Sequence, residues 1–201
     1  MPNASYCADR AANITTMNDD GSVFRVTACA QYGAHHNAYR LCGTRGQIEN
    51  LRGMGEQVML RYNAWETPAG EESERLYTPA WNDKDEALIK KSGHGGGDYL
   101  TVRTFLDCVK AGHQPPHPFD IYAATTMSSV ALLGHRSAME GGRVYDLLNF
   151  RREEDRQRYE RDDLTPFWGE DGSAPTLPCC SDPTYRPTEK QMALYFEELK
   201  K

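Results

Sequence analysis

The fold of this chain is decided by the stretch Tyr39-Arg40-Leu41-Cys42-Gly43-Thr44-Arg45-Gly46-Gln47-Ile48-Glu49. Residues 39–42 favour a short strand, and the two glycines of 43–46 are typical of a tight turn. Residues 47–51 then favour a returning strand. The stretch therefore predicts an antiparallel hairpin.

Further strands are predicted on both sides of this hairpin. Ala12 to Met17 is a β-prone run, and the turn formers of residues 18–21 follow it. Ser22 to Tyr32 and Glu56 to Tyr62 alternate between apolar and polar side chains, and Arg75 to Thr78 favours a last edge strand. The first part of the chain thus predicts an antiparallel meander of four to six strands.

After Trp81 the pattern changes to that of helices. Residues 90–97 read as a glycine-rich loop, and Asp98 stands where a helix N-cap is expected. Gly112 is placed to end this helix, and Asp120 to cap a longer one that ends at Gly141-Gly142. The first helix has apolar residues at helical spacing, namely Val102, Phe105, Leu106 and Val109. Strands followed by helices predict the α+β class.

The last fifty residues differ in character from the rest. Residues 151–163 are a charge run, read as a solvated helix or arm, and residues 166–187 are rich in proline. A final helix is predicted from Thr188, with Gln191 completing a capping box. We therefore divide the chain into a domain at 1–150 and an extension at 151–201.

Composition excludes several classes of protein. The 201 residues are 39% hydrophobic and 26% charged with a net charge of −6, and no basic stripe suggests a nucleic-acid partner. The chain has no apolar run long enough to span a membrane and no signal-like N-terminus, so we expect a cytoplasmic protein. Six cysteines without zinc-finger spacing are expected to be reduced thiols, namely Cys7, Cys29, Cys42, Cys108, Cys179 and Cys180.

A second specific segment is His94-Gly95-Gly96-Gly97-Asp98-Tyr99, with the helix that follows it and Asp120-Ile121-Tyr122-Ala123-Ala124 opening the next. In this order and spacing, residues 10–165 resemble the C-terminal domain of the Gfo/Idh/MocA (glucose–fructose oxidoreductase/inositol dehydrogenase) family, close to its branch of NAD-dependent glycosidases. The resemblance implies an open, mostly antiparallel sheet with helices packed on one face, as in dihydrodipicolinate reductase-like domains.

The resemblance also implies a function. Such a domain binds the substrate, a sugar or cyclitol, against NAD or NADP held by a Rossmann domain, and it forms homo-oligomers through its sheet. These 201 residues lack the Gly-x-Gly-x-x-Gly fingerprint and the family's Glu-Lys-Pro lysine. We therefore assign no catalytic or cofactor-binding residue and expect the chain to be inactive alone. Two alternatives stay open: part of an NAD-dependent glycosidase, or a non-catalytic assembly module.

Five residues are candidates for contact with the substrate. His35, His36 and Asn37 lead into the strand of Tyr39, in the stretch that contacts substrate hydroxyls in the family; the alternative is a polar bend between strands. His94 lies in the glycine loop, which allows close approach of a ligand. The histidines lack zinc-site spacing, so no metal is expected.

Overall fold

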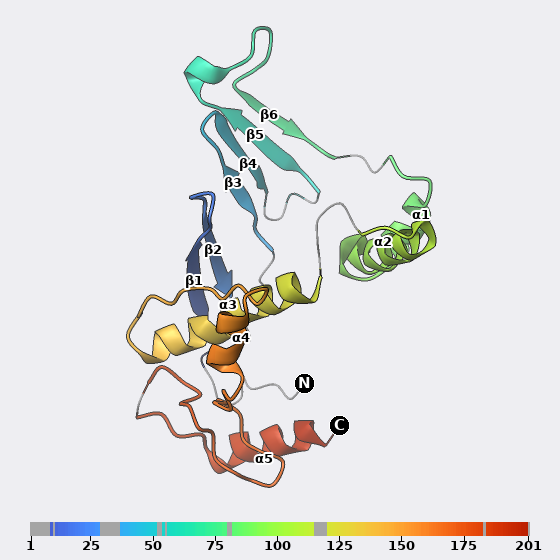
Figure 1. Ribbon diagram of the computed structural model, residues 1–201. Coiled ribbons are helices and arrows are strands. Elements are labelled where there is room, and N and C mark those ends of the chain that lie inside the picture. Colours follow the sequence, from blue (N-terminus) through green and yellow to red (C-terminus); the bar gives the residue numbers. More distant parts are fainter. Residues whose placement is uncertain are drawn as a thin grey trace. The chain divides into compact units, whose positions relative to one another are not determined.

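The computed structural model describes residue 9 and residues 11–28, 37–51, 54, 56–79, 82–114, 120–182 and 184–200. The chain forms two compact units, shown in Figure 1 and described separately here. Unit 1 combines Met1–Gly33 with Pro116–Lys201, and unit 2 is Ala34–Pro115. Antiparallel sheets and helices together confirm the α+β class. The division of the chain at residue 150 stays a prediction.

Unit 2 contains a four-stranded antiparallel sheet in the order β3-β4-β5-β6. The predicted hairpin is confirmed, with Leu41 opposite Ile48. Gly46 is needed where β4 meets β5, because a Cβ there would lie 2.1 Å from the carbonyl oxygen of Arg61. A short 3-10 turn, η2 (Ala64–Glu66), follows strand β5. The strands are β3 (Arg40–Cys42), β4 (Gly46–Asn50), β5 (Val58–Tyr62) and β6 (Glu74–Tyr77).

This sheet has one polar and one largely apolar face. Residues directly opposite one another in an antiparallel register share a face, and faces alternate along each strand. The polar face carries Arg40, Cys42, Gln47, Glu49, Met59, Arg61, Glu74 and Leu76. The opposite face carries Leu41, Ile48, Asn50, Val58, Leu60, Tyr62, Arg75 and Tyr77. Such a division is typical of an antiparallel sheet in which one face is packed against other parts of the protein and the other is open to solvent.

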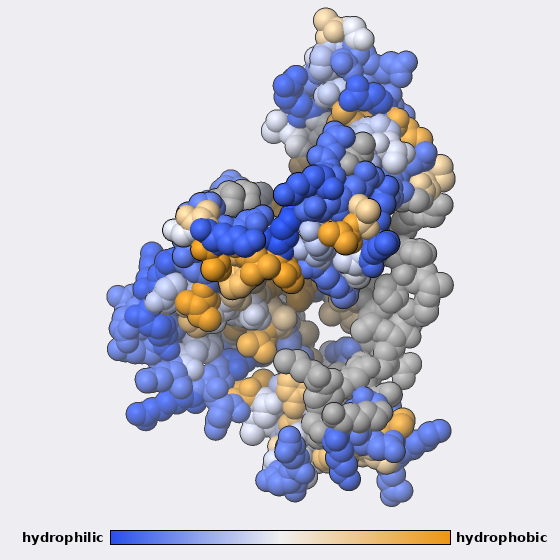
Figure 2. All heavy atoms as spheres, turned by 90° about the vertical axis from the view of Figure 1, so that its right-hand side faces the viewer, coloured by the Kyte–Doolittle hydropathy of each residue, from blue (hydrophilic) through white to orange (hydrophobic). Residues whose placement is uncertain are grey.

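Two helices and a 3-10 turn follow the sheet in unit 2. They are α1 (Glu86–Lys91), η3 (His94–Gly96) and α2 (Gly97–Ala111). The prediction of a loop over residues 90–97 was wrong at its start, since α1 runs through Lys91. Gly112 ends α2 as expected, in the left-handed conformation with φ 66°. The predicted apolar positions of α2 are exposed, and Figure 2 shows apolar side chains gathered in patches among polar ones.

Asp98 is not the N-cap that the sequence predicted. The N-cap position of α2 is occupied by Gly96, and Asp98 lies inside the first turn, where its side chain caps no backbone amide. The reason is that glycines at 95 and 96 adopt left-handed backbone angles, which turn the chain into the helix two residues earlier. The carboxylate is thereby released for another contact, described below.

Unit 1 pairs a two-stranded hairpin with a long helix. Strands β1 (Ala12–Met17) and β2 (Val23–Ala28) are antiparallel and separate from the other sheet, so the described strands form two sheets where the sequence predicted one meander. Helix α3 (Ile121–Met139) begins at Asp120, whose carboxylate accepts the amide of Ala123 at 3.0 Å, as predicted. Ile14 of β1 lies against Gly134 of α3: a Cβ added at Gly134 would lie 2.9 Å from Cδ1 of Ile14. This contact binds the hairpin to α3.

The C-terminal part of unit 1 contains α4 (Glu153–Tyr159) and α5 (Glu189–Leu199). The charge run forms α4, and the predicted capping box of α5 is present at Thr188 and Gln191. Tyr195 of α5 packs within unit 1: it is 1% exposed, and its hydroxyl donates to the carbonyl oxygen of Trp168 at 3.1 Å.

Candidate functional site

His94 and Asp98 form a hydrogen-bonded pair at the start of α2. The Nδ1 of His94 lies 2.8 Å from Oδ1 of Asp98. The imidazole is 86% exposed and the carboxylate 57% exposed, so the pair stands out from the surface of unit 2. Within the described residues, no hydrogen bond or ion pair is found at the second ring nitrogen, Nε2. The pair therefore presents one imidazole nitrogen to a ligand while the carboxylate holds the other.

The backbone around this pair is built from glycines. His94 itself has φ 53°, a left-handed angle that costs a non-glycine residue on the order of 1 kcal/mol. A Cβ at Gly93 would lie 2.4 Å from Oδ2 of Asp98, and a Cβ at Gly96 would lie 2.5 Å from Cγ2 of Ile89. Ile89 is 1% exposed. The glycines thus let the turn pack on α1 while the histidine is held outward.

Asn37 and Tyr39 lie at the entrance to β3, where Asn50 fastens their backbone. The side-chain amide of Asn50 donates to the carbonyl oxygen of Asn37 at 3.0 Å and accepts the backbone amide of Tyr39 at 2.6 Å. The Tyr39 side chain remains exposed. His35 and His36 lie outside the described residues. Asn37 and Tyr39 therefore form one group, with a fixed backbone and a tyrosine ring open to solvent.

The structure does not join this group to His94. Both belong to unit 2, but no hydrogen bond, ion pair or ring contact among its described residues links His94 to Asn37 or Tyr39. The assignment of all five candidates to one substrate site stays a prediction.

A row of alternating charges, which was not predicted from the sequence, crosses the polar face of the sheet. Glu49 of β4 contacts Arg40 at 2.7 Å and Arg61 at 3.8 Å, and Arg61 also contacts Glu74 at 3.1 Å. Glu49 is the least exposed of the four, at 14%. Each strand contributes one charge, so the signal could be found only from the alternation together with the strand register. Exposed ion pairs contribute little stability, but such groups can donate to and accept from hydroxyls.

A second missed cluster fastens the segment before α1 to α2. Arg103 donates to both carboxylate oxygens of Asp83 at 2.7 Å, and to Asp85 at 3.0 Å. Its guanidinium also lies over the ring of Tyr99, 5.6 Å from the centroid. The hydrogen bonds from Arg103 lower the pKa of Asp83 to about 2 from an ordinary 3.8. Unit 2 therefore gains an acid-sensitive contact.

The Asp83 contact predicts a pH dependence of stability. A carboxyl whose pKa is depressed on folding stabilises the fold above its unfolded pKa, and this contribution is lost as pH falls toward the folded pKa. We expect α2 to lose stability between about pH 4 and pH 2, with a proton taken up on unfolding. Hydrogen exchange of the α2 amides across this range measures it. Asp83→Asn should reduce the dependence of α2 stability on pH, whereas Glu72→Gln, a matched control, should leave that dependence unchanged. Equal slopes of stability against pH in the wild type and both variants would contradict the role assigned to Asp83.

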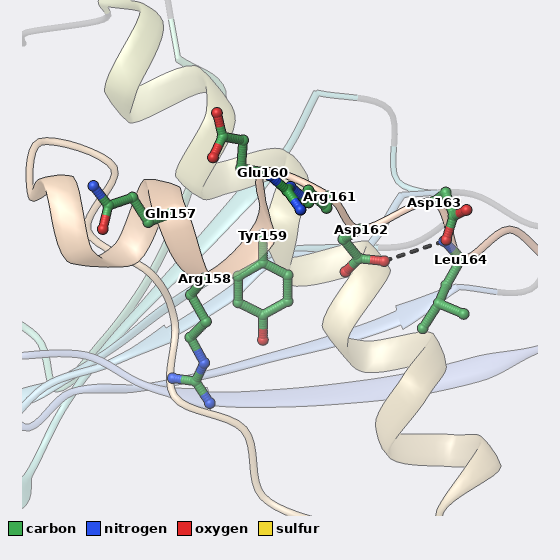
Figure 3. A pocket seen from close by; sticks show the side chains of 8 residues that line it. All are labelled: Gln157, Arg158, Tyr159, Glu160, Arg161, Asp162, Asp163 and Leu164. Atoms are coloured by element: carbon green, nitrogen blue, oxygen red, sulfur yellow. Dashed lines mark hydrogen bonds between the residues drawn. The ribbon is translucent and has the colours of Figure 1, made fainter.

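A shallow hollow of about 350 Å³ lies on the end of α4 and the segment that follows it (Figure 3). Arg136 of α3 contacts Asp162 at 2.6 Å, and Asp162 also accepts the amide of Leu164. The hollow is lined by one continuous stretch, so no second element converges on a ligand there. We assign it a structural role at the junction of α3 with the charge run. Its lining residues are Gln157, Arg158, Tyr159, Glu160, Arg161, Asp162, Asp163 and Leu164.

The described cysteines are free thiols. Cys180 donates to Asp9 at 3.1 Å, and burial raises the pKa of both Cys179 and Cys180, so these thiols stay protonated near neutral pH. Cys42 and Cys108 are also free, whereas Cys7 and Cys29 lie outside the described residues. In the part of the chain that the structure describes, no group of His, Cys, Asp or Glu is arranged to hold a metal ion, and no helix is long and apolar enough to cross a membrane.

The glycine-rich segment does not fit a dinucleotide. A dinucleotide-binding turn connects a buried strand to a helix and needs glycines so that the pyrophosphate can approach. Here the segment follows helix α1, and Gly96 is packed against Ile89. These glycines serve helix packing and the exposure of His94.

The antiparallel sheets and the helices that accompany them form an α+β arrangement, which is consistent with the C-terminal domain class of the Gfo/Idh/MocA proteins. The chain belongs to the glycosyl hydrolase 109, C-terminal domain family, whose model matches residues 16–156. This places it in the glycosidase branch, as the sequence resemblance suggested. No solved structure matches the chain.

Curated relatives share part of the chain. It is similar to an alpha-N-acetylgalactosaminidase of Tannerella forsythia, 36% identical over 67 residues, which are 33% of this chain and 14% of that protein. A glycosyl hydrolase family 109 protein of Streptomyces niveus is 35% identical over 80 residues, which cover 37% of this chain and 16% of that protein. Another protein of family 109, from Parabacteroides distasonis, is 29% identical over 86 residues, which cover 36% of this chain and 18% of that protein. The matched part thus spans less than a fifth of each relative.

Proposed function

We propose that this chain is the sugar-facing domain of a glycosidase that uses NAD and acts on α-N-acetylgalactosaminides. The observation that carries the proposal is the family match over residues 16–156. The similarity to an alpha-N-acetylgalactosaminidase supports the substrate class. These findings favour the glycosidase alternative over a sugar or cyclitol dehydrogenase. The NAD, and the groups that do chemistry with it, are assigned to a Rossmann domain outside these 201 residues.

The proposed contacts with the sugar come from unit 2. His35, His36, Asn37 and Tyr39 lead into β3, and His94 stands at the start of α2. Their imidazole, amide and phenol groups can each donate and accept hydrogen bonds, as a sugar with several hydroxyls requires. The exposure of Tyr39 and His94 supports this role, because both side chains are open to a ligand.

Saturation-transfer NMR with methyl α-N-acetylgalactosaminide tests sugar binding. The chain is expected to transfer saturation to this sugar and not to sucrose. In parallel, the chain with NAD should release no p-nitrophenol from p-nitrophenyl α-N-acetylgalactosaminide, and NADH should show no fluorescence change on titration. Absence of sugar binding would contradict the proposed role, and hydrolysis by the chain alone would contradict the assignment of catalysis to another domain.

The apolar face of the sheet favours a second candidate, a module for assembly. Leu41 on that face is 67% exposed, and apolar surface of this kind is commonly covered by a partner. A second copy of the chain would cover it symmetrically, which gives a homo-oligomer through the sheet.

Sedimentation measurements test this assembly. We expect a dimer or larger species, and Leu41→Lys should shift it toward monomer by at least tenfold in dissociation constant, because a charge would be buried against apolar surface. The matched control is Gln47→Lys, which adds the same charge to the polar face and should leave association unchanged. A monomeric wild-type chain, or equal effects of the two variants, would eliminate sheet-mediated assembly.

A further inference from the structure

The pair of His94 and Asp98 has a definite direction of hydrogen bonding. An ionised carboxylate has no proton to donate, so it accepts from Nδ1 at 2.8 Å and keeps the proton on that nitrogen. The neutral imidazole must then carry its lone pair on Nε2. Since the ring is 86% exposed, this lone pair is offered to the exterior of unit 2.

We infer that Asp98 is a positioning residue that makes His94 a hydrogen-bond acceptor for the sugar through Nε2. The inference rests on the proposed function for the identity of the ligand. The group recognised at Nε2 is a donor, either a sugar hydroxyl or the N–H of the acetamido substituent. A sugar that places only an ether oxygen there is rejected, because two acceptors face one another.

The local structure is arranged around this pair. Gly93 leaves room for Oδ2 of Asp98, and His94 is held at φ 53°, an angle that residues other than glycine rarely adopt. Two nearby cations in the sequence have other partners: Lys90 pairs with Glu86 at 2.6 Å, and Arg103 pairs with Asp83 and Asp85; among the described residues, the ion pair found for Asp98 is that with His94. The carboxylate of Asp98 is thus left to orient the imidazole.

Nitrogen-15 NMR of the imidazoles in the 201-residue chain reads the tautomer directly. The wild-type chain is expected to show His94 protonated on Nδ1. In Asp98→Ala no side-chain acceptor faces Nδ1, so nothing holds the proton there, and the tautomer protonated on Nε2, which presents a donor to the ligand, should gain population. A wild-type His94 protonated on Nε2 in its neutral form, or a tautomer unchanged by Asp98→Ala, would overturn the inference.

Titration with methyl α-N-acetylgalactosaminide completes the test. The sugar should shift the Nε2 signal of His94, and Asp98→Ala should weaken binding by roughly two- to tenfold, the effect of one hydrogen bond. His94→Asn is the matched variant, because asparagine tolerates the left-handed backbone but has no imidazole; it should weaken binding to a similar extent. If the sugar binds but does not shift the Nε2 signal, and both variants bind it as tightly as the wild type, the inference is overturned while the proposed function stands. No sugar binding at all contradicts the proposed function, and the inference with it.

Discussion

Gly96→Ala is expected to lower the free energy of unfolding of unit 2 by about 3 kcal/mol. Gly96 has φ 99°, an angle that disfavours any side chain. An added Cβ would also lie 2.5 Å from Cγ2 of Ile89, which is 1% exposed and so has little room to move. The backbone and the packing penalties act together. Hydrogen exchange of the α2 amides under increasing urea measures the change.

Gly95→Ala is the matched control. Gly95 is also left-handed, with φ 63°, but a Cβ there would meet nothing within 4 Å. Gly95→Ala should lower the free energy of unfolding only by the backbone penalty, about 1 kcal/mol. Combining Gly96→Ala with Ile89→Ala should recover part of the packing term, giving a coupling of about 1–2 kcal/mol between the two sites. Equal effects at positions 95 and 96 would show that the contact with Ile89 is not made.

Tyr195→Ala is expected to destabilise unit 1 by about 4 kcal/mol, the usual cost of deleting a buried aromatic ring. Tyr195 is 1% exposed and fastens α5 to the proline-rich segment through its bond to Trp168. Urea unfolding followed by tryptophan fluorescence measures the loss. Tyr195→Phe keeps the ring and removes the hydroxyl, so it should cost about 1 kcal/mol. A loss below about 1 kcal/mol in the alanine variant would mean that α5 is not docked through this ring.

Local features of the fold were predictable from sequence. The β3–β4 hairpin follows from Gly43 and Gly46, the end of α2 from Gly112, and the start of α3 from Asp120. Each of these signals acts over a few residues, through a backbone angle or a bond to a nearby amide. Helix α1 was missed because its six residues precede Gly93 without a clear apolar period.

The candidate site was predictable in part. His94 was expected in a glycine-rich loop, and the structure places it, exposed, in the 3-10 turn η3 among those glycines. Asp98 was expected to cap the helix and instead orients the histidine, because the left-handed Gly95 and Gly96 move the start of α2. The charges that Glu49 links across the sheet could not be predicted without the register of the strands.

The sequence by itself determined most of the strand and helix segments, the glycine turns and the membership of the family, since these depend on neighbouring residues and on their order. Tertiary structure alone decided that Arg103 holds Asp83 and Asp85, that Ile14 lies on Gly134, and that Tyr195 reaches Trp168. These partners are separated along the chain, and each contact needs two elements packed at a defined distance. Local propensities do not specify that distance, because it results from the packing of the folded unit.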